Sequence, residues 1–223
     1  MGAVCERLSR RVKDQGDRPT CVAFAVSSLH EYWRDIFIGE REEVTLDLSE
    51  EFLYYGCKQR DSLAGKSGTT ITAAKEWLEG MGQCLEELHL YRSSDGGLRK
   101  PSTAAFSDAY GRRLNELVCR ELRWEVLQRD LDGTMPVVGV IELFENARRV
   151  DERGLLMLPR SIEKSLGLHA ILLLEVETIR RDNQVVFLNS WGTRWGEGGV
   201  GRFDAIYFAR YCRQLWTIER SAL

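Results

Sequence analysis

The chain has 223 residues, of which 43% are hydrophobic and 29% are charged, and it carries a formal net charge of −3. A chain of this size can bury a substantial core, so we expect one globular domain over residues 1–223. The charge balance provides no basic face, so we expect no nucleic acid partner. The longest apolar run, near HAILLLEV, is too short to span a bilayer, so we expect no membrane association.

The first 130 residues carry helical patterns. Apolar residues recur at three- and four-residue steps after Cys21, Thr20 is a suitable N-cap, and Gly39 is a suitable terminator. Two acidic residues follow Ser49, which is typical of the first turn of a helix. We expect four helices: one over 21–37, one from 49, one from 70 or 72 to about 80, and one over 104–130, with a break near Gly111 as an alternative.

From residue 135 the pattern changes to short segments rich in β-branched and aromatic residues, which are typical of strands. We expect five strands, at 135–143, 168–177, 184–191, 200–204 and 215–219. A helical half followed by a strand half predicts an α+β fold. The two lobes would cover approximately residues 12–130 and 131–223, and lobes packed side by side would leave a cleft.

Six cysteines are scattered along the chain without a C-x-x-C pair. This spacing suggests neither a zinc site nor a redox pair. The N-terminal sequence MGAVCERLSRRVK lacks the apolar segment of a signal peptide. An even number of cysteines allows three disulfides, but without an export signal we expect free thiols in a reducing cytoplasm.

Cys21 is a candidate nucleophile because it opens the first predicted helix. The thiolate is the reactive form of cysteine, and the N–H groups and dipole at a helix start stabilise that anion. A buried structural thiol is nevertheless the commoner role of a single cysteine. A catalytic role for Cys21 therefore requires a base elsewhere in the chain.

The chain offers three histidines as that base. His30 lies about two and a half turns after Cys21 on the same predicted helix, which is too far to touch the thiol. His89 has no polar neighbours in the sequence. His169 opens a predicted strand in the second half, so a cleft between two lobes would place it opposite Cys21.

A catalytic imidazole needs a partner that holds its second nitrogen. Asn189 ends the strand that follows His169, and adjacent antiparallel strands would bring the two together. Trp191 would shield that hydrogen bond from water. For the oxyanion of acyl transfer, the backbone N–H of Cys21 and the side-chain amide of Gln15 are candidate donors.

Four blocks in this order resemble the papain family of cysteine peptidases: VKDQGDRPTCVAFA, LSEEFLYYGC, GLHAILLLEVE and VVFLNSWGTRWGEGGVGRF. They extend from residue 12 to residue 204, and the segment SGTTITAAKEWLEGMGQCLEELHLY is similar to compact intracellular bacterial members. The resemblance implies a two-lobe α+β fold. In that fold a helical N-terminal lobe packs on an antiparallel β-barrel C-terminal lobe, with the active-site cleft between them.

Carried across by motif position, the resemblance also implies residue roles. It makes Cys21 the nucleophile, His169 the base and acid, Asn189 the residue that orients His169, and Gln15 the oxyanion donor. Trp191 would cover the pair formed by the histidine and the asparagine.

The resemblance further implies that Gly68 aligns an extended substrate and that Gly167 and Ala170 form part of a specificity pocket. Departures from the family pattern include positions 18 and 22, the segment AGKSGTT, which lacks the partner cysteine, and Leu168, which stands where secreted members often have a polar residue. Val22 stands where the family usually has tryptophan, and Arg18 stands where it often has a disulfide cysteine.

These observations predict a thiol-dependent peptidase, expected to be an endopeptidase, that acts on protein or peptide substrates through an acyl-enzyme and needs no metal or cofactor. A papain-like acyltransferase or transpeptidase using the same site is an alternative, and so is a catalytically silent binding module. Because the first motif begins at residue 12, we expect no inhibitory pro-segment of the kind the family has. We therefore expect activity to be restrained by substrate choice, by a regulatory protein partner or by another part of a larger system.

Overall fold

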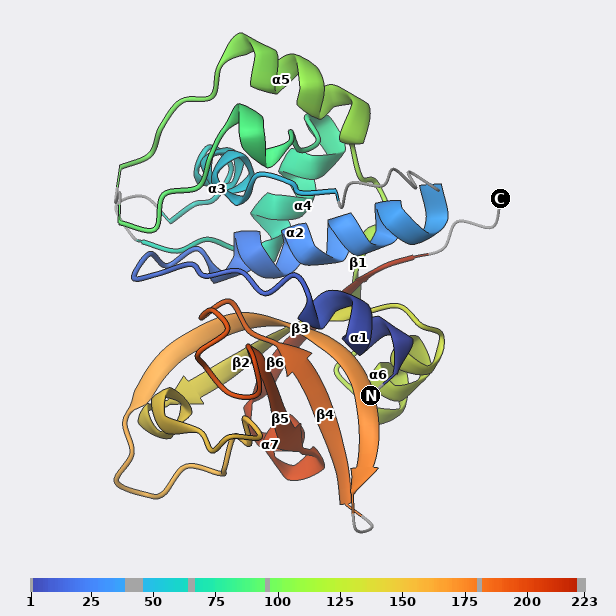
Figure 1. Ribbon diagram of the computed structural model, residues 1–223, viewed down its shortest axis with the longest axis vertical. Helices are drawn as coiled ribbons and strands as arrows, with labels where there is room; N and C mark the ends of the chain where they lie inside the picture. Colours follow the sequence, from blue (N-terminus) through green and yellow to red (C-terminus); the bar gives the residue numbers. More distant parts are fainter. Residues whose placement is uncertain (1, 39–45, 64–66, 95–96, 180–181, 220–223) are drawn as a thin grey trace. The chain divides into compact units, whose positions relative to one another are not determined.

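The computed structural model describes residues 2–38, 46–63, 67–94, 97–179 and 182–219, and it combines helices with one six-stranded sheet (Figure 1). The predicted α+β class is confirmed. Gly39, at which the first helix was expected to end, lies outside the described residues. Within the described residues, no helix has the length and hydropathy needed to cross a bilayer.

The chain divides into two compact units. The strand-rich unit comprises Met1–Asp14 and Val118–Ile218, and the helical unit comprises Gln15–Leu117 and Glu219–Leu223. The chain therefore passes into the helical unit after Asp14, returns to the strand-rich unit after Leu117 and crosses once more after Ile218.

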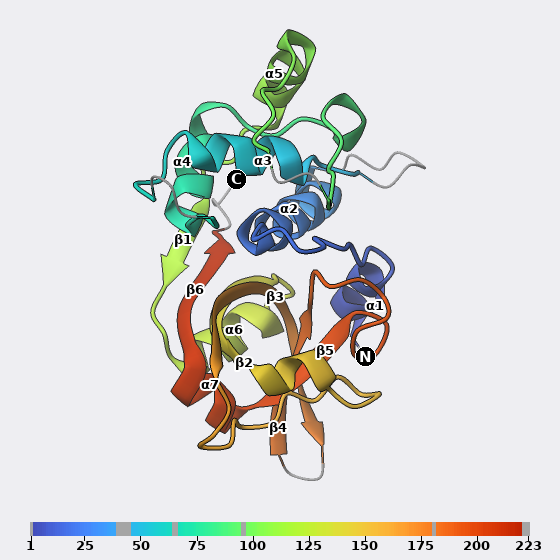
Figure 2. The same ribbon diagram turned by 90° about the vertical axis from the view of Figure 1, so that its left-hand side faces the viewer.

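Three helices form the centre of the helical unit (Figure 2). They are α2 (Cys21–Trp33), which continues into a π-helical turn over Arg34–Ile38, α3 (Glu50–Lys58) and α4 (Ile71–Gly80). The hydroxyls of Ser49 and Thr70 accept hydrogen bonds from the first turns of α3 and α4, so both helices begin where the sequence predicted.

A glycine allows α3 and α4 to pack closely. A Cβ at Gly56 would lie 2.0 Å from the ring of Trp77, so only hydrogen fits at this position. The rings of Phe52 and Phe106 surround the same indole, with centroids 5.7 and 6.3 Å away. Phe106 comes from α5 (Thr103–Ala109), which a 3-10 turn over Tyr110–Arg112 extends.

The sheet belongs mainly to the strand-rich unit, and its strands lie in the order β1-β6-β2-β3-β4-β5. Among the described residues its edge strands β1 and β5 do not pair with each other, so the sheet is open where the family resemblance implied a closed barrel. The strands are β1 (Leu117–Arg120), β2 (Val137–Phe144), β3 (Ser165–Ile179), β4 (Asp182–Leu188), β5 (Val200–Asp204) and β6 (Cys212–Ile218).

Helices cover this sheet. In Figure 1, α1 (Ala3–Ser9) lies beside the sheet in contact with β3 and β4, while α6 (Trp124–Asp132) and α7 (Ala205–Tyr211) pack on β2 and on each other. Asp204 ends β5 and its carboxylate accepts a hydrogen bond from Tyr207 N–H, which starts α7 directly after the strand. The sequence patterns did not predict α1 or α7.

A continuous helix over residues 104–130 is wrong, whereas the alternative of a break near Gly111 agrees with the end of the helical segment at Arg112. The structure divides this segment into α5, the strand β1 and α6. Leu117 is fully buried where β1 joins the edge of the sheet beside β6, and Arg123 adopts an extended conformation before α6. Tertiary pairing with β6 outweighs the helical propensity of this charged segment.

Candidate active site

Cys21 is the first residue of α2 and is partly exposed, whereas most of that helix is buried. The sequence predicted Thr20 as the N-cap of this helix, but its side chain makes no capping hydrogen bond. Its hydroxyl lies 2.8 Å from the hydroxyl of Tyr91 instead. Because the Tyr91 hydroxyl donates to the Gln15 carbonyl, the Thr20 hydroxyl is the donor to Tyr91.

Gln15 is buried, and hydrogen bonds hold both its side chain and its backbone carbonyl. Its Nε2 donates to the carbonyl of Arg18 at 2.7 Å, and its own carbonyl accepts from the Tyr91 hydroxyl at 2.7 Å. The next residue, Gly16, has φ +59°, and a Cβ there would lie 2.7 Å from Cβ of Ser93. The side chain of Gln15 and the backbone at Gly16 are therefore held in place within the helical unit.

His169 lies five residues into β3 rather than opening it, and it pairs across the sheet with Ile141. Asn189 follows β4, the strand antiparallel to β3. His169 Nε2 lies 2.8 Å from Asn189 Oδ1, and both side chains are buried. The structure thus brings together the two residues that the sequence placed on adjacent strands.

The surrounding backbone determines which imidazole nitrogen carries the proton. Ser190 N–H donates to Asn189 Oδ1 at 2.9 Å, so this atom of the amide is the oxygen. An amide oxygen accepts and never donates, so His169 Nε2 must carry a hydrogen. The neutral imidazole then has its lone pair on Nδ1, the nitrogen that can take up a proton.

Trp191 packs on the imidazole ring of His169. Its ring centroid lies 5.1 Å from that of His169 and 5.7 Å from that of Trp195, which it meets edge-on. The N-terminal segment of the strand-rich unit supports the same loop, because Asp14 forms an isolated β-bridge with Trp191 and the Lys13 carbonyl accepts from Gly192 N–H at 3.1 Å.

The predicted substrate-binding glycine Gly68 lies in the helical unit, whereas Gly167 and Ala170 lie in the strand-rich unit. Gly68 has φ +91°, is partly buried and accepts a hydrogen bond from Lys58 Nζ at 3.1 Å within the helical unit. Gly167 is exposed with φ +95° in β3, whereas Ala170 is buried in the same strand. Leu168, between Gly167 and His169, is 61% exposed.

A family model for papain family cysteine proteases matches residues 5–211. The chain belongs to the papain family. Both the predicted family and the predicted enzyme class, a cysteine peptidase, are therefore confirmed.

Proteins of low sequence identity to this chain occur in a virus and in a mite. An uncharacterised peptidase C1-like protein of Acanthamoeba polyphaga mimivirus is 25% identical over 218 residues, which cover 92% of this chain and 68% of that protein. Peptidase 1 of the mite Dermatophagoides pteronyssinus is 23% identical over 194 residues, which cover 87% of this chain and 57% of the mite protein. Xylellain, a cysteine protease from Xylella fastidiosa, has a similar fold, with a TM-score of 0.83 and 21% identity over 94% of this chain and 82% of xylellain.

The six cysteines of this papain-family chain all lie in its described part, and none forms a disulfide. Burial raises the pKa of four of them to about 12, which keeps these thiols protonated at neutral pH: Cys5, Cys57, Cys84 and Cys212. Cys21 and Cys119 are the two that reach solvent. No group of three His, Cys, Asp or Glu residues in the described chain is arranged to hold a metal ion.

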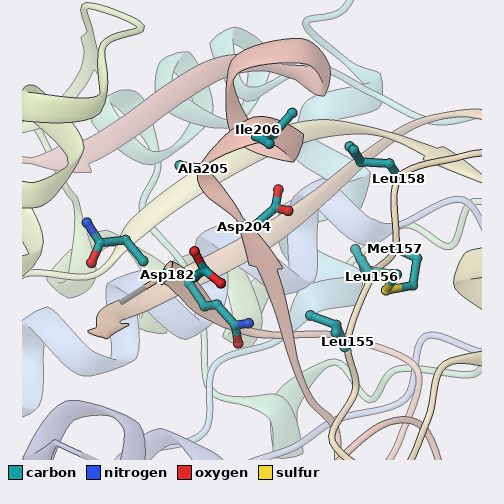
Figure 3. A pocket seen from close by; sticks show the side chains of 10 residues that line it. Leu155, Leu156, Met157, Leu158, Asp182, Asp204, Ala205 and Ile206 are labelled. Carbon is teal, nitrogen blue, oxygen red and sulfur yellow. The ribbon is translucent and has the colours of Figure 1, made fainter. Parts of the chain in front are cut away.

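A pocket of about 510 Å³ lies elsewhere in the strand-rich unit (Figure 3). Its lining combines apolar side chains from Leu155 to Leu158 and from Ile206 with the carboxylates of Asp182 and Asp204. The predicted site residues are not among those that line it.

Several residues around the candidate site make contacts that no sequence pattern predicted. Tyr91 bonds to the loop before α2, Glu51 pairs with Arg18, Lys58 binds the Gly68 carbonyl, and Ser190 orients the amide of Asn189 through its backbone. Tyr91 and Glu51 are distant in sequence from the residues that they support, so no local motif reveals their contacts. The unusual arginine at position 18 was the one available signal.

Proposed function

We propose that this chain hydrolyses peptide bonds with Cys21 as nucleophile and His169 as base and acid. The observation that carries the proposal is the hydrogen bond from His169 Nε2 to Asn189, because it reserves Nδ1 for proton exchange with a thiol. The position of Cys21 at the start of α2 supports the thiolate form. Thiolate and imidazolium together would constitute the resting ion pair.

The proposed reaction has two steps. The Cys21 thiolate attacks the carbonyl carbon and forms a C–S bond, the C–N bond breaks, and His169 delivers its proton to the leaving amine. Water, deprotonated by the neutral imidazole, then attacks the thioester, the C–S bond breaks and the acid product leaves. No metal or organic cofactor enters these steps.

We assign the developing oxyanion to the Cys21 backbone N–H and to the amide of Gln15. The amide has two N–H bonds, and one of them donates to the Arg18 carbonyl. We assign the other to the oxyanion. One such donor is worth about 10²- to 10³-fold in kcat, so Gln15→Ala should show a loss of that size.

Cys21→Ala tests the nucleophile, and Cys119→Ser, which removes the other solvent-accessible thiol, is the matched control. We expect hydrolysis of a peptide blocked at both termini to vanish in the first variant and to persist in the second. Blocked termini also test endopeptidase action, since an exopeptidase requires a free end. Full hydrolysis by Cys21→Ala would refute the assignment.

Mass spectrometry of the products, with an acceptor amine added, separates peptidase from transferase. A peptidase yields the free acid, whereas an acyltransferase yields the new amide. A folded wild-type protein in which Cys21 resists both substrate and iodoacetamide would instead be a silent binding module. The pH–rate profile of a peptidase should be bell-shaped because thiol and imidazole titrate as a coupled pair.

We also infer a reducing, cytoplasmic setting, supported by six cysteines without a disulfide. The free energy of unfolding should therefore be the same with and without dithiothreitol. A loss of stability on reduction would contradict this inference.

A further inference from the structure

Arg18 forms a buried ion pair with Glu51. The guanidinium binds both carboxylate oxygens: Nη1 donates to Oε2, and Nη2 donates to Oε1 at 3.1 Å. Nη1 also donates to the Arg92 carbonyl at 3.0 Å. The Glu51 side chain is 0% exposed, and Arg18 as a whole is 6% exposed. This two-bond geometry holds the guanidinium in one orientation.

Two aromatic rings complete the site of the guanidinium. Its central carbon lies 4.9 Å from the ring centroid of Tyr91 and 5.4 Å from that of Tyr54. Burial alone would lower the pKa of Arg18, but the hydrogen bonds and charge of Glu51 outweigh burial and raise it. Arg18 is therefore a permanent buried cation clamped by a carboxylate and two ring faces.

The backbone of Arg18 connects this clamp to the proposed oxyanion site. Its carbonyl accepts from Gln15 Nε2 at 2.7 Å and from Thr20 N–H at 2.8 Å. The hydroxyl of Tyr91, whose ring contacts the guanidinium, donates to the Gln15 carbonyl. A side chain anchored on α3 thus orients the Gln15 amide through the main chain of its own residue.

We propose that Arg18 is a positioning residue, whose ion pair with Glu51 holds the Gln15 amide in place to bind the oxyanion. This inference rests on the proposed function, because it assigns a purpose to the loop that precedes Cys21. Arg18 occupies the position at which the family pattern often has a disulfide cysteine. The ion pair therefore holds the loop before Cys21 in place, as a disulfide at this position could. Unlike a disulfide, it does not depend on redox state.

A purely structural ion pair is the competing explanation. Replacing both members of such a pair by apolar residues often preserves or improves stability, because desolvation of the charges is costly. A positioning role predicts something else: the apolar replacement restores stability but leaves the Gln15 amide without its specific anchor. The two explanations therefore differ in kcat at equal stability.

The test compares Arg18→Met with the double variant Arg18→Met/Glu51→Leu. We expect Arg18→Met to lower kcat by roughly 10- to 100-fold with little change in KM, since the oxyanion donor acts in the transition state. The double variant should recover the melting temperature but not kcat. Arg120→Met, which breaks the ion pair with Asp130 in the strand-rich unit, is the control and should retain kcat.

A double-mutant cycle links the effect to Gln15. If Arg18 acts through this amide, Gln15→Ala should cost about tenfold less in the Arg18→Met background than in the wild type. Additive losses would overturn the proposal. Recovery of wild-type kcat in the double variant would overturn it as well, because the ion pair would then be structural only.

Amide hydrogen exchange tests the positioning without relying on catalysis. The Thr20 amide, which donates to the Arg18 carbonyl, should exchange at least about tenfold faster in Arg18→Met and in the double variant, while amides of β4 and β5 remain protected. Unchanged exchange at Thr20 would overturn the proposal. A wild-type protein that hydrolyses no peptide would instead refute the proposed function, and exchange at Thr20 would still decide whether Arg18 holds the loop.

Discussion

Replacing Asn189 by alanine tests the proposed site most directly. The substitution removes an acceptor 2.8 Å from His169 Nε2 at a place where Asn189 is 3% exposed. An unsatisfied buried donor costs about 1–3 kcal/mol. If the hydrogen bond orients the imidazole in the transition state, this cost enters the activation barrier. We therefore expect kcat to fall by roughly 5- to 150-fold.

The assay is steady-state hydrolysis of a blocked peptide over a range of pH, with urea unfolding of each variant measured in parallel. Asn189→Asp is the informative companion, because it keeps an oxygen acceptor and adds a negative charge that favours the imidazolium. We expect its activity to extend to higher pH than that of the wild type. Asn115→Ala, at an exposed position in the helical unit, is the matched control and should leave kcat unchanged.

A folded Asn189→Ala protein with wild-type kcat would refute the reasoning. If its stability fell while kcat stayed the same, Asn189 would serve the fold through its bond with Ser190 N–H and not the reaction. If kcat fell in Asn189→Ala but the pH profile of Asn189→Asp matched that of the wild type, the asparagine would act by shape alone. The charge added in Asn189→Asp would then not stabilise the imidazolium.

Three further predictions concern thiol reactivity, acid stability and helix packing. Iodoacetamide should alkylate Cys21 and Cys119 and spare the four buried thiols, whose pKa burial raises to about 12; peptide mass spectrometry will identify the modified sites. Burial alone would raise the pKa of Asp61, but hydrogen bonds from Lys58 outweigh burial and lower it. This carboxylate therefore stabilises the fold above the pKa of the unfolded chain, about 4, and that stabilisation is lost as pH falls through the folded pKa. Urea unfolding between about pH 5 and pH 3 should show a smaller loss of stability for Asp61→Asn than for the wild type. Gly56→Ala should lower the free energy of unfolding by about 1–3 kcal/mol, because a Cβ would lie 2.0 Å from the indole ring packed on it.

Each of these predictions has a control and a contradicting result. Cys119→Ser should reduce labelling to one site, and modification of a buried thiol in folded protein would contradict the burial argument. Asp132→Asn, at an exposed position in the strand-rich unit, is the control and should lose as much stability in acid as the wild type. A steeper acid loss in Asp61→Asn would reverse the assigned sign. Gly111→Ala places its Cβ in open space, so an equal effect at Gly56 and Gly111 would exclude a packing origin.

Sequence patterns predicted correctly those helices and strands whose ends are determined by neighbouring residues in the chain. The strand over 200–204 has the predicted bounds, because an apolar strand pattern ends at the helix-capping Asp204. The helix after Ser49 begins where the two acidic residues of its first turn predicted, and the next begins at the first of its two predicted starts, after Thr70. The segment 104–130 failed for the opposite reason: its strand exists only through pairing with β6, which lies almost a hundred residues later in the chain.

The same distinction applies to the candidate site. Strand adjacency sufficed to predict that His169 and Asn189 meet, since two antiparallel strands with a short connection must bring such positions together. The anchoring of Gln15 was not predictable, because it depends on Glu51 and Tyr91, which approach only when the helical unit has packed. A charged residue that pairs inside a core looks like any surface charge in the sequence.

The stretch from Lys13 to Cys21 makes hydrogen bonds that hold residues of the proposed site in both units. Lys13 and Asp14 support the loop of Trp191 in the strand-rich unit, while Gln15 and the residues after it are held within the helical unit. One short segment thus contributes to the support of both halves of the proposed site. Its own side chains supply few apolar contacts, so its conformation depends on hydrogen bonds and on the buried ion pair of Arg18. Such interactions require definite geometry, and they specify one loop conformation more strictly than nondirectional apolar burial does.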